Sequence, residues 1–159
     1  MRLLASVLCL VAVLGLPRTA HASDTANSTV VVTAQFSTRT SLKVSTELLR
    51  FDVADPAQAG TAVVDFSAAA RTPSGADVVL SVEPLRGIEG PGGAADVDAA
   101  LSFSGEGAGT LAGAIDVSRP SVAGRWSGSG IRTGRLVFAL HATAAGSYTL
   151  PVRFVLSVP

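Results

Sequence analysis

The chain has 159 residues, with twelve lysines and arginines against twelve aspartates and glutamates, so its formal net charge at pH 7 is zero. Because it has no basic excess with which to neutralise a row of phosphates, we expect no nucleic-acid partner. A single cysteine and two histidines exclude a disulfide-stapled scaffold and supply few of the soft ligands that zinc or copper requires.

The first 22 residues have the pattern of a removable secretory signal. Arg2 gives a positive start, residues 3–16 are apolar and free of charge, and Ala20 and Ala22 are small residues at the positions that a signal peptidase reads. The apolar run is shorter than the about 20 residues that a membrane-spanning helix needs. We therefore expect the mature protein to be exported to the periplasm, the cell surface or the extracellular medium, with no membrane span after cleavage.

From residue 29 onward, apolar residues alternate with small or polar ones, which is the period of strands that bury one face. The last strand is the clearest, since six residues of one parity between Tyr148 and Val158 are all apolar. The other inward-facing sets that the alternation predicts are Val30, Val32, Ala34 and Phe36; Leu49, Phe51 and Val53; Val64, Phe66, Ala68 and Ala70; Val78, Leu80 and Val82; Leu101 and Phe103; and Leu136, Phe138 and Leu140.

Turn signals separate these strands, and no stretch shows the 3.6-residue period of a capped amphipathic helix. We expect residues 23–28 to be a flexible N-terminus and residues 29–159 to form one all-β domain, an immunoglobulin-like antiparallel β-sandwich of about seven to nine strands. A closed barrel is the alternative. Pro151 cannot donate to a ladder within the last strand, so its position should be an edge, a bulge or a strand switch. The glycine-rich region 104–134 predicts either two irregular strands or a long hairpin.

The mature chain offers no pattern for a catalytic, metal or cofactor site. Its only histidine, His141, has the parity that faces away from the core, and the chain contains no Gly-x-Ser-x-Gly elbow. Asp96 and Asp98 supply too few oxygen ligands for a calcium loop. Residues 105–109 are rich in glycine but lack the spacing and the Lys-Ser/Thr of a phosphate-binding loop, so we expect a hairpin or surface loop there. We predict that the protein is not an enzyme and needs no cofactor.

Two aromatic residues outside the phenylalanines are the remaining candidates for ligand contact. Tyr148 begins the last strand and is better explained as a core or corner residue. Trp126 is flanked by Arg125 and by the serine- and glycine-rich residues 127–130, which makes it the one residue to test for contact with a ligand. Packing of Trp126 in the core is the alternative.

The two ends of the mature chain carry a family resemblance. In residues 145–158, a glycine and an aromatic residue precede strict alternation, and in residues 29–53 a β-rich extension precedes a Leu-x-Phe strand. These stretches resemble the closing and opening strands of secreted fimbrial subunits and of the related spore coat protein U-like domains. The absence of mature cysteines and the proline within the closing strand depart from that family.

The resemblance implies assembly by strand addition, in which a subunit lacks one strand and a neighbour's N-terminal extension fills the gap. The donor strand would present Val30, Val32, Ala34 and Phe36. The alternative is that residues 30–44 form the first strand of a self-complete domain. Two functions follow: an exported structural or surface-assembly protein that pairs with itself or other subunits, or a self-complete binding module for a glycan or a protein partner.

Overall fold

The computed structural model describes residues 37–93, 95 and 98–159, so the predicted signal peptide, the residues 23–28 and the predicted donor residues lie outside the described part. The described residues form nine strands and one 3-10 turn, Pro91–Gly93. None of them forms a helix that is long and apolar enough to cross a membrane. The strands are β1 (Arg39–Val44), β2 (Leu48–Val53), β3 (Gly60–Arg71), β4 (Asp77–Pro84), β5 (Ala100–Glu106), β6 (Ala112–Ile115), β7 (Ser121–Ser127), β8 (Gly130–His141) and β9 (Gly146–Ser157).

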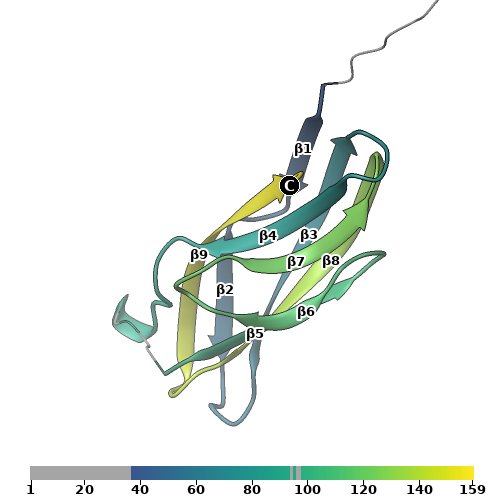
Figure 1. The fold of residues 1–159 in the computed structure, drawn as a ribbon. Helices are drawn as coiled ribbons and strands as arrows, with labels where there is room; N and C mark the ends of the chain where they lie inside the picture. Colours follow the sequence, from purple (N-terminus) through teal and green to yellow (C-terminus); the bar gives the residue numbers. More distant parts are fainter. Residues whose placement is uncertain (1–36, 94, 96–97) are drawn as a thin grey trace, which may run out of the picture. The chain divides into compact units, whose positions relative to one another are not determined.

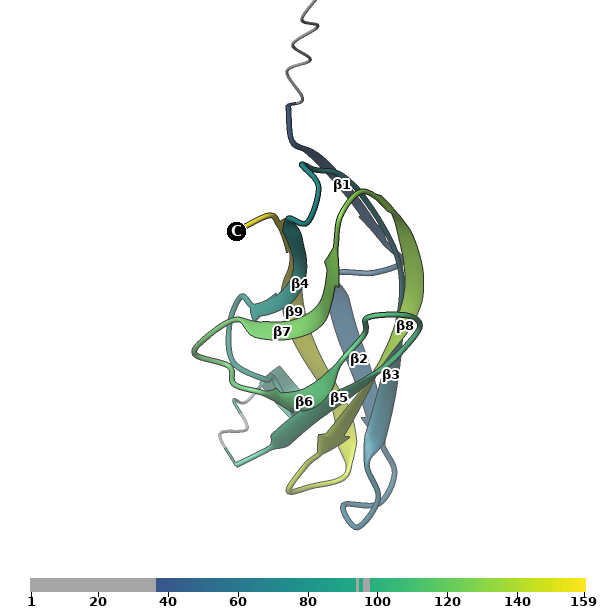
Figure 2. The same cartoon turned by 45° about the vertical axis from the view of Figure 1, so that its right-hand side comes forward.

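The strands build two antiparallel sheets that pack against each other, which confirms the predicted β-sandwich (Figure 1). The first sheet has the order β1-β3-β8-β5-β6, and the second has the order β2-β9-β4-β7. With one exception, the connection between β5 and β6, each link along the chain crosses from one sheet to the other. Figure 2 shows the two layers from the side, with β1, β3 and β8 in one and β2, β9, β4 and β7 in the other.

The strand order refines the immunoglobulin-like prediction. Four ladders nest inside one another, since β5 pairs with β6, β4 with β7, β3 with β8, and β2 with β9. The chain from β2 to β9 is therefore one long hairpin, with its tip between β5 and β6, that is rolled up so that successive ladders alternate between the sheets. This is the connectivity of a jelly roll, whereas immunoglobulin domains have the order ABED in one sheet and CFG in the other.

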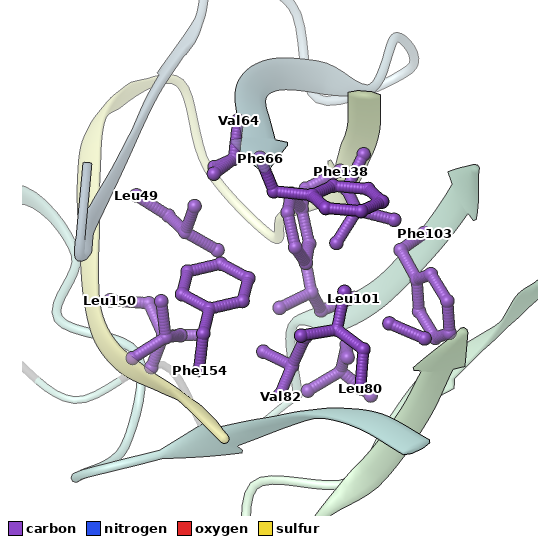
Figure 3. Packing of buried hydrophobic residues seen from close by; sticks show 14 of the residues in the cluster. Leu49, Val64, Phe66, Leu80, Val82, Leu101, Phe103, Phe138, Leu150 and Phe154 are labelled. Carbon is purple, nitrogen blue, oxygen red and sulfur yellow. The ribbon is translucent and has the colours of Figure 1, made fainter. Parts of the chain in front are cut away.

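Alternation along each strand builds the core between the sheets (Figure 3). The inner residues of β9 show the pattern, because Tyr148, Leu150 and Val152 are each at most 1% exposed. The rings of Phe103 and Phe138, on neighbouring strands, lie 6.2 Å apart in a tilted arrangement. No polar or charged residue of the described part is buried. Burial of apolar surface, at about 25 cal/mol per Å², is therefore the main source of stability.

Two regions for which the sequence left alternatives open now have definite structures. At Pro151 the pairing of β9 with β2 ends, and from Val152 onward β9 pairs with β4, so the proline marks a strand switch. The region 104–134 contains the β5–β6 hairpin, which includes residues 105–109, followed by β7 and the start of β8.

Candidate functional site

The chain changes sheets at residues 45–47, between β1 and β2. On the side of the first sheet, the amide of Ser45 donates to the carbonyl oxygen of Asp65 at 2.9 Å, and the amide of Asp65 donates to the Ser45 hydroxyl at 3.0 Å. On the side of the second sheet, the amide of Val152 donates to the carbonyl oxygen of Glu47 at 2.8 Å. Thr46 stabilises the crossing, since its hydroxyl oxygen accepts the amide of Leu48 at 3.1 Å.

This crossing determines how the two edges of β9 are used. On one edge, β4 pairs with residues 152–157, and the chain after β4 continues along the same edge, where the amide of Leu85 donates to the carbonyl oxygen of Pro151 at 3.0 Å. On the other edge, β2 pairs with residues 146–151. Among the described residues, no strand pairs with residues 153–157 on this second edge. We call this segment the free edge of β9.

The backbone of the free edge offers hydrogen-bonding groups to an additional strand. Successive residues of a strand direct their N–H and C=O groups to alternate sides. Because the Val152 amide points toward β2, the backbone groups of Phe154 and Leu156 point to the same side. An extension of β2 in its own register would place residues 42–46 beside residues 153–157, but β1 takes that part of the chain to β3 instead.

Apolar side chains that are only partly covered surround the free edge. Leu42 and Val44 on β1, and Leu156 and Val158 at the end of the chain, are half-buried and pack against the edge of the core. Figure 1 shows the end of β9 beside β1, in agreement with the contacts between the two strands. We call these four residues, with Phe154, the β1/β9 corner. An additional strand in the second sheet would lie opposite β1 and would cover this corner.

The charged side chains near the corner point away from it. Lys43 has the outward parity of β1 and is exposed. Arg153 pairs with Glu83 on the outer face of the second sheet, where its Nε donates to a carboxylate oxygen at 2.9 Å. The corner can therefore offer apolar contact and backbone hydrogen bonds but no charge. That combination suits binding of an extended peptide rather than a chemical reaction.

The structure places the residues singled out in the sequence at separate locations. Trp126 is 9% exposed and belongs to the core, and its indole nitrogen is buried without a hydrogen-bond partner within the described part. Tyr148 is a core residue at the start of β9, since it is 1% exposed, and its hydroxyl donates to the carbonyl oxygen of Ala144 in the turn between β8 and β9 at 2.8 Å. His141 is exposed at the end of β8.

The shifted titratable groups lie on the surface, in ordinary ion pairs. The pKa of Asp116 is lowered, first by hydrogen bonds from the hydroxyl and amide of Ser118 and further by Arg119. A hydrogen bond to Asp65 raises the pKa of Arg135. Within the described residues, no three histidine, cysteine or acidic side chains gather closely enough to hold a metal ion.

Sequence reasoning identified the closing strand but not the corner. The alternation of β9 continues through Leu156 and Val158 and carries no signal of their partial exposure, which follows from the pairing of β1 with β3 in the other sheet.

Comparison with known proteins assigns no family to the chain. No protein-family model matches its sequence, and neither does any curated protein. Function is therefore inferred from the free edge of β9 and the corner around it.

Proposed function

We propose that this chain is a non-catalytic, exported structural or surface-assembly protein of the pilin-like kind, whose subunits join by strand addition at the free edge of β9. The observation that carries the proposal is the free edge of β9. On this edge β2 pairs only with residues 146–151, because β1 lies with β3 in the other sheet, and the backbone groups of residues 153–157 that point to this edge have no strand beside them among the described residues. The predicted signal in residues 1–22 supports export.

The chemistry of the corner fits an apolar strand. An unpaired strand edge is a template for pairing with another chain, and backbone hydrogen bonds supply affinity while pockets for alternate side chains supply specificity. The half-buried residues Leu42, Val44, Leu156 and Val158 lie where such side chains would dock. The predicted donor strand presents Val30, Val32, Ala34 and Phe36 on one face, an apolar row with the period that this mode requires.

One observation favours the second function, a self-complete binding module for a glycan or a protein partner. The described residues alone already form a nine-strand sandwich with one continuous core, which a subunit dependent on a donated strand does not need to have. The two functions differ in oligomeric state, because a self-complete module remains a monomer.

Sedimentation velocity on freshly refolded protein of residues 23–159 tests the proposal over a range of concentrations. We expect oligomers that grow with time, and we expect a variant lacking residues 23–37 to remain a monomer. Leu156→Lys should also stop growth, because it directs a charge inward at the free edge. Val155→Lys, one residue away on the opposite face, is the matched control and should assemble normally. If the protein of residues 23–159 is a monomer and removal of residues 23–37 does not change this, the proposal is overturned and the binding module is the function that remains.

A further inference from the structure

β1 is an edge strand of the first sheet, and within the described part of the chain no strand lies on its outer side. On its inner side, the ladder with β3 continues to Ser45, whose amide donates to the carbonyl oxygen of Asp65. Because the backbone groups of a strand point to alternate sides, those of residues 40, 42 and 44 point away from β3. We call this the outer edge of β1. It can form backbone hydrogen bonds with one more strand.

β1 differs from the other edge strands of the two sheets. β6 has only four residues. β7 is hydrogen-bonded to the chain just before β6, since the amide of Leu111 donates to the carbonyl oxygen of Ala123 at 2.9 Å. The outward face of β2 carries both signs of charge, because Arg50 and Asp52 are both exposed there.

The outward face of β1 carries positive charge alone. Arg39, Ser41 and Lys43 share this face and are exposed, and neither cation forms an ion pair within the part of the chain that the structure describes. In an antiparallel strand added at the outer edge, the residues opposite these three would form non-hydrogen-bonded pairs, whose Cα atoms lie about 4.5 Å apart and whose side chains are close. Opposite charges in such pairs stabilise the ladder, and like charges destabilise it. The outer edge of β1 therefore favours a strand with acidic residues opposite Arg39 and Lys43.

The inward face of β1 determines the other half of the pattern. Leu42 and Val44 are half-buried and pack against the core, so apolar residues opposite them would extend this contact. A second copy of β1 meets the apolar requirement but not the charge, since it would bring Arg39 and Lys43 of both chains onto one face of the ladder. Charged side chains on an edge strand commonly prevent such self-pairing.

We propose that the outer edge of β1 binds an extended acidic segment of another protein by antiparallel strand addition. The segment has an acidic residue at each end of five, opposite Lys43 and Arg39, and apolar residues at its second and fourth positions. This site lies in the first sheet and selects by charge, whereas the free edge of β9 lies in the second sheet and accepts an apolar strand. The proposal therefore does not depend on strand addition at the free edge of β9.

Amide NMR of the isotope-labelled mature protein, residues 23–159, tests the site with the peptide acetyl-Gly-Val-Asp-Val-Thr-Val-Asp-Gly-amide. We expect saturable binding of one peptide per chain, with slower hydrogen exchange of the amides of Leu42 and Val44. The amides of Ser41 and Lys43 already face β3 and should change little. The same peptide with asparagine in place of both aspartates should bind about fivefold more weakly, the loss expected for two cross-strand charge pairs.

Variants identify the contacts and separate this site from the free edge of β9. Lys43→Gln should weaken binding of the aspartate peptide by about twofold to fivefold and leave binding of the asparagine peptide unchanged. Arg50→Gln, at an exposed arginine of the edge strand β2, is the matched control and should leave binding of both peptides unchanged. Leu156→Lys, which closes the free edge of β9 to an apolar strand, should also leave the affinity for the aspartate peptide unchanged.

Three results would overturn the proposal. The first is equal binding of the two peptides, or a loss of affinity in Arg50→Gln as large as that in Lys43→Gln. The second is protection of the amides of Phe154 and Leu156 by the peptide instead of those of β1. The third is protection of the β1 amides that rises with protein concentration in the absence of peptide, because a second copy would then occupy the outer edge.

Discussion

The amide of Val152 donates to the carbonyl oxygen of Glu47 at 2.8 Å, and among the described residues this is the last hydrogen bond that β9 makes on its β2 side. Ser45, which lies two residues before Glu47, is hydrogen-bonded to Asp65 of the first sheet. The short crossing from β1 to β2 therefore places a strand beside residues 146–151 of β9 and leaves the backbone groups of the free edge, residues 153–157, available to another strand.

Gly134→Ala should destabilise the fold by about 1–3 kcal/mol, because the site has no room for a methyl group. A Cβ atom at Gly134 would lie 2.7 Å from the carbonyl oxygen of Glu106 and 2.8 Å from the ring of Phe66. Urea unfolding followed by circular dichroism measures the change. Gly87→Ala is the control, since a Cβ atom there meets nothing within 4 Å, and its stability should change by less than about 1 kcal/mol. Equal stability of the two variants would show that β8 packs less closely against β3 and β5 than described.

Trp126→Ala should cost about 3–5 kcal/mol, the loss usual for a large aromatic side chain in a core. Trp126 is 9% exposed, and its ring lies so close to Gly124 that an added Cβ atom there would meet it at 3.1 Å. The same urea experiment measures it, with Leu85→Ala, at a side chain that is 58% exposed, as the control. If Trp126→Ala lost no more stability than the control, Trp126 would not be a core residue and would again be a candidate for ligand contact.

Tyr148→Phe removes one hydroxyl and keeps the ring in place, so it isolates the hydrogen bond to Ala144. We expect a loss of about 0.5–1.5 kcal/mol, because the carbonyl oxygen of Ala144 loses a partner at a half-buried position. Differential scanning calorimetry measures the accompanying fall in melting temperature. An unchanged melting temperature would mean that water replaces the hydroxyl without cost.

Ser118→Ala should raise the pKa of Asp116 toward its ordinary value, because the largest cause of its low pKa is the hydrogen bond from the Ser118 hydroxyl. The folded pKa lies below the unfolded one, so the carboxylate contributes stability above the unfolded pKa and loses it as pH falls through the folded pKa. NMR titration of the Asp116 side-chain carbon measures the change. A pKa that is the same in both proteins would contradict the assigned cause.

The sequence predicts which face of each strand is buried far better than it predicts where the strand lies. Period two correctly assigns Tyr148, Leu150 and Val152 to the core, because alternation is a local property of the backbone. The prediction weakens in β7, where Val122 and Trp126 have the same parity but only Trp126 is buried. The ladder shifts register between Leu80 and Ser81, and this bulge places Ala123 inside and leaves Val122 38% exposed.

The strand order and the free edge depend on contacts between distant parts of the chain. The jelly-roll order is set by ladders such as β2 with β9, which join residues about a hundred positions apart and leave no local mark in the sequence. Alternation gave the parity of Leu156 and Val158 correctly, but their partial exposure follows from the departure of β1 to the other sheet.

Disulfide trapping between two copies tests the central claim most directly, because the mature chain has no cysteine of its own. Protein carrying Ala34→Cys is mixed with protein carrying Leu156→Cys and oxidised, and the products are identified by mass spectrometry. We expect a dimer joined between residues 34 and 156, with Val155→Cys as the outward-facing control giving little product. Equal trapping by the two positions of β9, or no intermolecular product, would contradict strand addition at this edge.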